Sequence, residues 1–330
     1  MGEFELIERY FKRPARPVMP ETVLGIGDDC ALLQPAPGCQ MAISSDMLVE
    51  GRHFFADVDP YTLGHKALAV NLSDLAACGA KPLAFTLALA LARADAAWLE
   101  PFARGLLALA DAHACELIGG DTTQGPLNIC ITVFGEVPVV HGRGMALLRS
   151  GARAGDDIYV SGTLGDARLA LEALQGHRAL PPALLARARR RLETPTPRIT
   201  LGMALRGLAT SAIDISDGLL GDLGHVLKAS AVGAFIDTSI TTGLMECQGP
   251  ELDGAVPNDV RLACVLSGGD DYELAFTAAP GARDAVQTAA ATSGTRVTRI
   301  GQVERESGLR LVDAQGAAVA KHYPSFDHFA

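Results

Sequence analysis

The chain has 330 residues, a length that favours two domains, and 48% of its residues are hydrophobic. Its formal net charge is −10 and it has no Lys/Arg-rich stripe, so nucleic-acid binding is disfavoured. The most apolar stretch, 82–98, is interrupted by Arg93 and Asp95 and is too short to span a bilayer. Seven cysteines without a C-x-x-C pair disfavour a zinc site and suit a reducing compartment, so we expect a cytoplasmic protein.

Hydrophobic periodicity and turn residues predict alternating strands and helices in the first half of the chain. The predicted strands are 40–45, 82–91, 116–120 and 128–138, and the predicted helices are 61–78 and 95–113. The Gly- and Arg-rich segment 139–155 lacks clean periodicity. We therefore expect an N-terminal domain over 1–138 and a linker over 139–155.

The same alternation returns in the second half, which we expect to form a C-terminal α/β domain over 156–330. Predicted strands are 156–162, 211–216, 234–238, 272–277, 296–303 and 309–312. Predicted helices are 163–174, two within 183–208, 217–230, one near 258–265, and 281–293. Alternating elements indicate an α/β or layered α+β fold, but they do not fix the order of the strands.

Acidic residues recur where the predicted elements end or turn: Asp28, Asp29, Asp46, Asp74, Asp121, Asp214, Asp217, Asp270 and Asp271. Each alone is explained by the preference of Asp for turns and helix N-caps. Asp74 is different, because it lies within an apolar helix and a buried carboxylate needs a partner. If the acids converge, their repulsion has to be neutralised, and oxygen ligands favour Mg²⁺ or Mn²⁺ over zinc.

Glycine-rich turns beside these acids indicate phosphate chemistry, because glycine lets backbone N–H groups approach an anion. The segments "IGGDTTQG" and "LSGGDDYEL" have this composition. Neither the Walker pattern nor G-x-G-x-x-G is present, since "GIGDDC" has Cys30 at the position of the last glycine. Any ATP site would therefore use neither standard loop.

Three further residues are candidate site residues, and two of them have an ordinary alternative explanation. Arg149 in "LLRSGA" could contact phosphate, but an exposed linker arginine fits the spacing equally well. His53 is a candidate site residue because it follows Asp46 by seven residues, but taken alone it is better explained as a satisfied or surface histidine. Ser216 in "DISDG" lacks the G-x-S-x-G context, so a nucleophilic hydrolase is disfavoured.

Taken together, these segments resemble the thiamine-monophosphate kinases. The resemblance spans nearly the whole chain in family order, through "LGIGDDCALL", "AISSDMLVEGRHF", "KALAVNLSDLAACGAKP", "LIGGDTTQGP", "RSGARAGDDIYVSGTLGD", "SAIDISDGLLGDLGHVLKAS", "LSGGDDYELAFT" and "FDHF". It implies a two-domain fold like that of aminoimidazole ribonucleotide synthetase and a homodimer whose N-terminal domains pair their sheets. It also implies ATP-dependent phosphorylation of thiamine monophosphate to thiamine diphosphate, with several Mg²⁺ ions and no covalent enzyme intermediate.

The resemblance assigns roles to individual positions and names no catalytic base. The implied metal ligands are Asp29, Ser44, Ser45, Asp46, Asp74, Asp121, Asp214 and Asp217. The implied ATP contacts are Gly120, Asp121, Arg149 and Ser216, and the implied thiamine monophosphate contacts are His53, Asp270 and Phe326.

The chain departs from the family at two of these contacts. Many members have Glu at the position of Asp270 and Trp or Tyr at that of Phe326, and the segment "VVHGRGM" lengthens the linker before Arg149. Two alternatives remain open. One is a related ATP-dependent synthetase acting on another small molecule, although residues 1–24 lack the cysteine that a selenophosphate synthetase needs. The other is a nucleotide or metal sensor that binds ATP without turnover.

Overall fold

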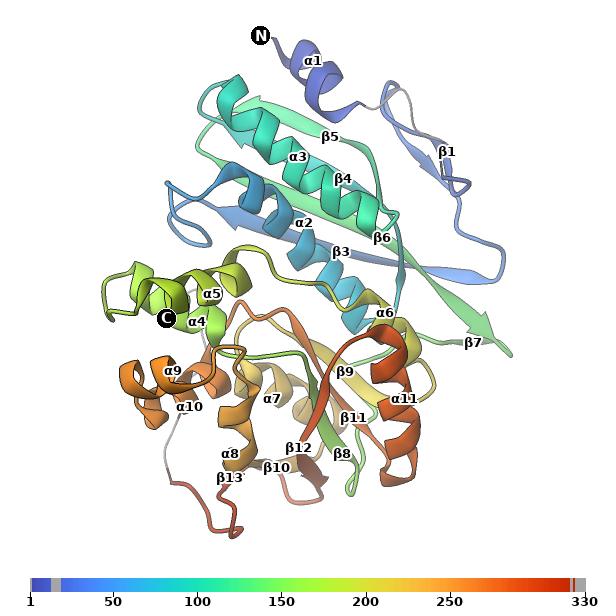
Figure 1. Cartoon of the computed structure of the whole chain (residues 1–330). Coiled ribbons are helices and arrows are strands. Elements are labelled where there is room, and N and C mark those ends of the chain that lie inside the picture. The colour runs from blue at the N-terminus through green and yellow to red at the C-terminus, as the bar shows by residue number, and fades with distance from the viewer. Residues whose placement is uncertain (1, 13–18, 321–322, 324–330) are drawn as a thin grey trace. The chain divides into compact units, whose positions relative to one another are not determined.

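The computed structural model describes residues 2–12, 19–320 and 323 of the chain. The chain divides into two compact units (Figure 1). Unit 1 comprises Met1–Leu75 and Ala80–Ala146, and unit 2 comprises Ala76–Gly79 and Leu147–Ala330. Within the described residues, no helix combines the length and apolar character that crossing a membrane would require.

Unit 1 is built on a mixed sheet with the strand order β3-β6-β4-β5, and the short β7 pairs with β6. Its strands are β1 (Thr22–Leu24), β2 (Leu32–Leu33), β3 (Cys39–Val49), β4 (Lys81–Leu91), β5 (Glu116–Gln124), β6 (Asn128–Val140) and β7 (Arg143–Gly144). Its helical segments are α1 (Glu3–Leu6), η1 (Ile7–Phe11), α2 (Pro60–Ala77) and α3 (Ala96–Ala112). The predicted strands and helices of this half are all present, and β5 extends past its two glycines to Gln124.

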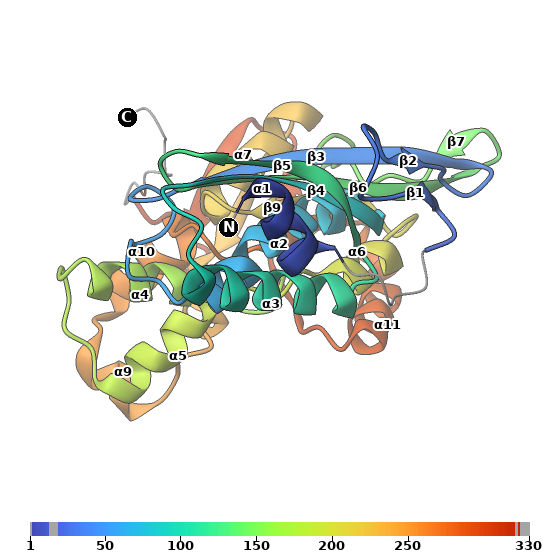
Figure 2. The ribbon, with the colours of Figure 1, turned by 90° about the horizontal axis from the view of Figure 1, so that it is seen from above.

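Helices α2 and α3 lie on one face of this sheet (Figure 2). Side chains of β4 alternate, so Phe85, Leu87 and Leu89 are buried while Ala88 between them is exposed. The two helices touch through Gly64 and Gly105, where an added Cβ would lie 2.1 and 1.9 Å from backbone oxygens of the other helix. The opposite face of the sheet has no helix among the described residues of unit 1.

Part of the predicted linker is strand. β6 continues to Val140 and turns back into β7, with Val140 paired to Arg143. The two residues between them, His141 and Gly142, have φ of 50° and 74°. Positive φ at both positions matches the two-residue turn that suits the twist of a hairpin. The β-branched pair Val139–Val140 favours this extension, which the Gly and Arg content of the segment had concealed.

Unit 2 contains a six-stranded sheet with the order β13-β10-β12-β8-β11-β9, antiparallel except for the β10–β13 pair. Its strands are β8 (Asp157–Ser161), β9 (Ala209–Ile215), β10 (Gly233–Asp237), β11 (Glu273–Ala278), β12 (Val297–Glu304) and β13 (Gly308–Val312). Its helical segments are α4 (Asp166–Leu174), α5 (Pro182–Glu193), α6 (Ile199–Ala204), α7 (Leu219–Ser230), α8 (Thr238–Thr241), η2 (Thr242–Leu244), α9 (Pro250–Ala255), α10 (Asn258–Ser267), η3 (Pro280–Ala282) and α11 (Arg283–Ser293).

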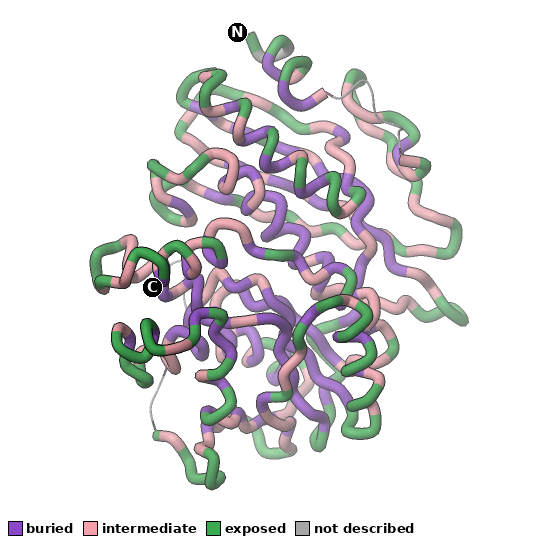
Figure 3. The backbone as a smooth tube through the Cα atoms, viewed as in Figure 1, coloured by how far each residue is buried: buried purple, intermediate pink, exposed green. Residues whose placement is uncertain are grey.

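The core of unit 2 surrounds the middle of this sheet. Every residue of β8 and β11 is buried, which is expected for strands that are covered on both faces (Figure 3). Ile158, Val160 and Ala275 from these strands belong to one large apolar cluster with side chains of α4, α7 and α10. The predicted alternation of strands and helices is confirmed here, and the strand order is supplied by the structure.

Candidate active site

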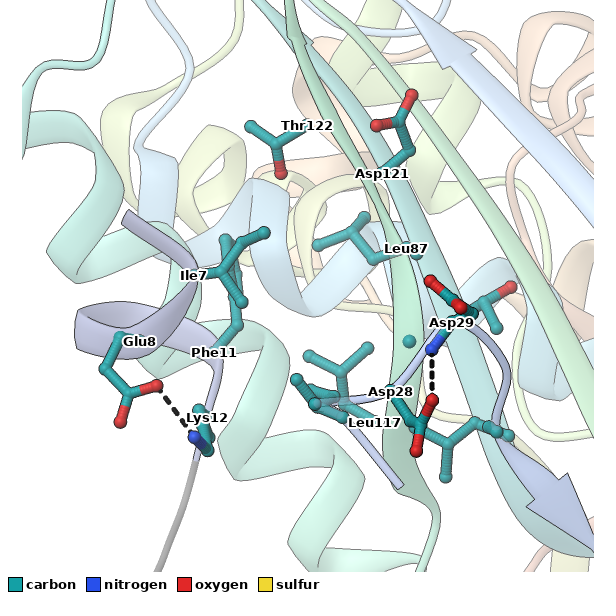
Figure 4. Close-up of a pocket in the computed structure, with 17 residues that line it drawn as sticks. Ile7, Glu8, Phe11, Lys12, Asp28, Asp29, Leu87, Leu117, Asp121 and Thr122 are labelled. Atoms are coloured by element: carbon teal, nitrogen blue, oxygen red, sulfur yellow. Dashed lines mark hydrogen bonds and ion pairs between the residues drawn. The ribbon is translucent and has the colours of Figure 1, made fainter. Parts of the chain in front are cut away.

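Unit 1 contains a pocket of about 740 Å³ between η1, the loop at 26–31 and the adjoining strands β4 and β5 (Figure 4). Its apolar wall includes Ile7, Phe11 and Leu117, and its polar wall includes Asp28, Asp29, Asp121 and Thr122. An apolar wall beside a few polar groups is the usual composition of a small-molecule site. The helical N-terminal segment was not predicted as part of a site, because its mixture of charged and apolar residues contains no recognised binding motif.

The three pocket aspartates are exposed. Asp28 Oδ1 accepts a hydrogen bond of 2.8 Å from the backbone N–H of Asp29 (Figure 4). Within the described part of the chain, no donor reaches the side-chain oxygens of Asp29 or Asp121. Carboxylates that keep their lone pairs toward solvent can ligate a hard cation.

Gly120 places Asp121 at this pocket. It has φ of +146° and lies opposite Leu87 in the β4–β5 ladder, where an added Cβ would stand 1.9 Å from the Leu87 carbonyl oxygen. No other residue type fits this close approach without moving the strand. The glycines therefore do not end β5 but let it continue beside β4 as far as Gln124.

The other predicted metal ligands of unit 1 lie on β3 and α2. Ser44 Oγ donates to Asp74 Oδ2, which supplies the partner that the half-buried Asp74 was expected to need. The backbone N–H of Asp46 donates to Asn71 Oδ1 at 3.1 Å, so this N–H group is directed toward α2. Ser45 points to the opposite face of the sheet, where its Oγ lies 2.9 Å from Thr132 Oγ1.

His53 follows β3 in a tight turn. Its Nδ1 accepts the backbone N–H of Val49 at 3.0 Å, and its own backbone N–H donates to the Val49 carbonyl at 2.9 Å. A neutral ring that accepts at Nδ1 carries its proton on Nε2. The ring is therefore held in one orientation beside the end of β3.

Unit 1 does not gather its predicted metal ligands at one point. Ser44 and Ser45 are on β3 at one edge of the sheet, and Asp121 is on β5 at the other. Three strand spacings separate these edges, which is about 14 Å. Among the described residues, no three His, Cys, Asp or Glu side chains form a group that could hold a metal ion.

In unit 2 the segments "DISDG" and "SGGDD" meet. The N–H of Asp270 donates to the Ser216 carbonyl at 2.9 Å, and an added Cβ on Gly269 would lie 2.4 Å from the same oxygen. Asp270 is thus brought beside Ser216 and Asp217, although more than fifty positions separate it from them in sequence. The three residues lie just before α7 and β11. Asp214 lies just upstream, buried in β9 opposite Leu274.

Asp222 is a residue of this site that the sequence did not single out. Its Oδ2 accepts the backbone N–H groups of Ser216 and Asp217, both at 3.0 Å, from the first turn of α7. Burial raises the pKa of its carboxyl to about 7. The available signal was an acid in the first turn of a helix that directly follows "DISDG".

One predicted contact, Arg149, stands apart from this cluster. Ser230 Oγ, at the C-terminal end of α7, donates to the Arg149 carbonyl at 3.3 Å, whereas Ser216 precedes the N-terminal end of the same helix. A helix of this length spans about 18 Å, so the backbones of Arg149 and Ser216 are far apart within unit 2. Phe326 lies outside the described residues. The roles of both remain predictions.

Comparison with known proteins identifies the class of protein to which the chain belongs. Residues 27–137 match the family described as AIR synthase related protein, N-terminal domain, and residues 153–314 match AIR synthase related protein, C-terminal domain. The division of the chain into two units agrees with these two matches, one to an N-terminal and one to a C-terminal domain.

Individual relatives show to which family within this class of proteins the chain belongs. The chain is 47% identical to "Thiamine-monophosphate kinase" of Escherichia coli (strain K12), over 100% of this chain and 98% of the relative. The crystal structure of thiamine-monophosphate kinase from Stenotrophomonas maltophilia K279a has 45% identity and a TM-score of 0.81, covering 91% of this chain and 93% of that one. A structure described as AaThiL complexed with AMPPCP and TMP has 28% identity and a TM-score of 0.74, covering 89% of each chain. The chain belongs to the thiamine-monophosphate kinase family.

Proposed function

We propose that this protein transfers the terminal phosphoryl group of ATP to thiamine monophosphate, giving thiamine diphosphate and ADP. The observation that carries the proposal is the 47% identity to a thiamine-monophosphate kinase over the whole chain. A phosphate oxygen of thiamine monophosphate attacks the γ-phosphorus, and the bond between the β–γ bridging oxygen and that phosphorus breaks. The acceptor is already ionised, so positioning and electrostatics suffice without a general base.

Mg²⁺ fits the donors that the site presents. They are carboxylate and hydroxyl oxygens, and Asp29 and Asp121 face solvent beside the pocket. Mg²⁺ keeps several waters and binds through one or two carboxylates plus substrate phosphates, so a dense cluster of acids is not required. Bound there, Mg²⁺ would neutralise charge on the phosphates. Ser44, Ser45, Asp46, Asp74, Asp214 and Asp217 complete the proposed ligand set.

Residues of the chain itself orient the two substrates. Gly120 brings its backbone beside the pocket without a side chain. Asp121, Ser216 and Arg149 contribute the remaining proposed ATP contacts. His53 and Asp270 are the proposed contacts to thiamine monophosphate, with Phe326 from the C-terminal segment. Asp270 can accept from an aminopyrimidine, and an aromatic ring can stack on the substrate.

We further propose that the protein works as a homodimer in the cytoplasm. Ile43 and Met47 are 63% and 53% exposed on the edge strand β3, and such an edge invites pairing with another chain. A second copy pairing its sheet here also offers a way to bring residues of the β3 edge and the β5 edge to one site. The seven cysteines are free thiols, which suits a reducing compartment.

The kinase proposal is tested by incubating the protein with Mg-ATP and thiamine monophosphate and separating the products by chromatography. Equal amounts of thiamine diphosphate and ADP are expected. Formation of another phosphorylated product from a rival acceptor would favour a related synthetase. ATP binding with no product over a range of Mg²⁺ and K⁺ would favour a sensor.

The dimer proposal is tested by mixing two inactive variants. Asp121→Asn alters the β5 edge and Asp74→Asn alters the β3 side. If each site is formed by Asp74 of one protomer and Asp121 of the other, a mixed dimer contains one intact site out of two. Random exchange makes about half of the dimers mixed, so about a quarter of the wild-type activity is restored. A mixture that stays inactive, with light scattering showing exchanged dimers, would contradict shared sites. A monomer in light scattering would contradict the dimer.

A further inference from the structure

Residues 270–273, where the chain enters β11 (Figure 1), have alternating buried and partly buried side chains, and the mechanism above uses only Asp270 of these four. Asp271 and Glu273 are 1% and 0% exposed. Asp270 and Tyr272, which alternate with them, are only partly buried. One pair of side chains therefore points into unit 2, and the other pair points away from its core.

The inward pair is anchored on other segments of unit 2. Both side-chain oxygens of Asp271 accept from the backbone N–H of Gly165, at 3.0 and 3.1 Å. Glu273 accepts from Arg191 Nη2 at 2.7 Å, Arg198 Nε at 2.6 Å and Ser161 Oγ at 2.6 Å. These contacts fix the chain on either side of Tyr272 to β8 and to the segments around α4, α5 and α6.

The backbone of the outward pair lies in the left-handed region. Asp270 has φ of 67° and Tyr272 has φ of 50°, a conformation that is unfavourable for L side chains and persists only where the surroundings enforce it. Two backbone hydrogen bonds enforce it here, from Asp270 N–H to Ser216 at 2.9 Å and from Tyr272 N–H to Ile215 at 2.8 Å.

This conformation turns the two outward side chains toward each other. The Tyr272 hydroxyl donates to Asp270 Oδ1 at 3.4 Å. The contact is long, but the anchored backbone on both sides keeps its two ends in place. An acceptor held in one orientation before binding loses less conformational freedom when the ligand arrives.

We propose that Tyr272 is a positioning residue for substrate recognition: its hydroxyl holds the Asp270 carboxylate in the orientation that accepts from the amino group of an aminopyrimidine. The inference rests on the proposed function, because the aminopyrimidine belongs to thiamine monophosphate. Tyr272 acts through Asp270 and takes no part in the phosphoryl transfer.

The test is calorimetric binding of thiamine monophosphate to the full chain, in the presence of Mg²⁺ and a non-hydrolysable ATP analogue. Tyr272→Phe removes only the hydroxyl and is expected to weaken binding about threefold to tenfold, with affinity for the analogue unchanged. Tyr159→Phe is the matched control, because its hydroxyl lies at the same 3.4 Å from a carboxylate, that of Asp157, elsewhere in unit 2. This control is expected to bind like the wild type.

A double-mutant cycle separates positioning from a general structural effect. In an Asp270→Asn background, Tyr272→Phe should cause less than a twofold further loss of affinity for thiamine monophosphate. The reason is that the carboxylate through which Tyr272 acts is already removed. Equal losses in both backgrounds, or unchanged binding by Tyr272→Phe alone, would overturn the proposal. Wild-type binding without turnover would overturn the kinase reaction and leave this test intact, whereas no binding by the wild type would overturn both.

Discussion

In unit 1, Asp28, Asp29 and Asp121 are exposed beside the pocket, whereas in unit 2 Asp157, Asp271 and Glu273 are at most 1% exposed. The buried acids each accept hydrogen bonds from backbone or side-chain groups of unit 2. A buried carboxylate without such partners would be costly, so these acids belong to the fold. The exposed acids keep oxygens available for a cation. Among these six acids, position relative to the core therefore separates the three that stabilise the fold from the three that can serve the reaction.

The largest expected effect is on turnover. Asp121→Asn removes charge beside the pocket and should lower kcat on the order of 10³-fold, because a preorganised electrostatic contact is lost. Its melting temperature should stay near that of the wild type, since the side chain is exposed. Glu251→Gln, an exposed acid on α9, is the control and should leave both unchanged. A stable Asp121→Asn enzyme with normal kcat would contradict the role given to the exposed acids.

The second expected effect is on stability. Glu273→Gln leaves the guanidinium groups of Arg191 and Arg198 without their carboxylate partner. Loss of one partner of a buried ion pair costs about 3 to 5 kcal/mol, which urea unfolding measures. If the variant unfolds at the same urea concentration as the wild type, Glu273 does not stabilise the fold, and the distinction between the buried and the exposed acids is wrong.

A smaller effect is expected where unit 1 does use an ion pair. Lys81 bridges Glu21 at 3.0 Å and Glu136 at 3.1 Å, and Glu136 also accepts the backbone N–H of Ala36 at 2.9 Å. These contacts hold both ends of the segment that carries Asp29. Because Lys81 is 44% exposed, Lys81→Met should cost about 1 kcal/mol or less.

The loosened segment should also raise the Mg²⁺ concentration needed for half-maximal activity. A magnesium titration measures this directly, with Lys228→Met on exposed α7 surface as the control. An unchanged magnesium dependence would show that Asp29 is positioned without Lys81.

The smallest effect is a pH dependence. Hydrogen bonding from Arg283, with a further contribution from Arg299, lowers the pKa of Asp157 below its usual value of 3.8. The folded state therefore favours the charged carboxyl, and this stabilisation is full above the unfolded pKa and lost as the pH falls through the folded one. The difference in urea midpoint between wild type and Asp157→Asn should be largest at neutral pH and shrink below pH of about 4. A difference that is constant with pH would contradict this ion pair.

Local patterns in the sequence predicted most of the elements and several features of the site. The spacing of apolar residues predicted α2. The position of Asp74 within this helix led to the expectation of a hydrogen-bonding partner, which Ser44 supplies. The acids at the predicted turns include those that line the pocket. Asp222 was missed because its role depends on reaching back to the N–H groups of Ser216 and Asp217.

The sequence by itself determined the alternation of strands and helices, the family, and the candidate acids, because these depend on local periodicity and on short motifs. Only the tertiary structure decided that β3 and β5 stand at opposite edges of one sheet, and that Asp270 and Tyr272 adopt left-handed backbone conformations. Strand order and enforced backbone geometry arise from contacts between residues far apart in the chain. A repeat of two or of 3.6 residues carries no information about those contacts.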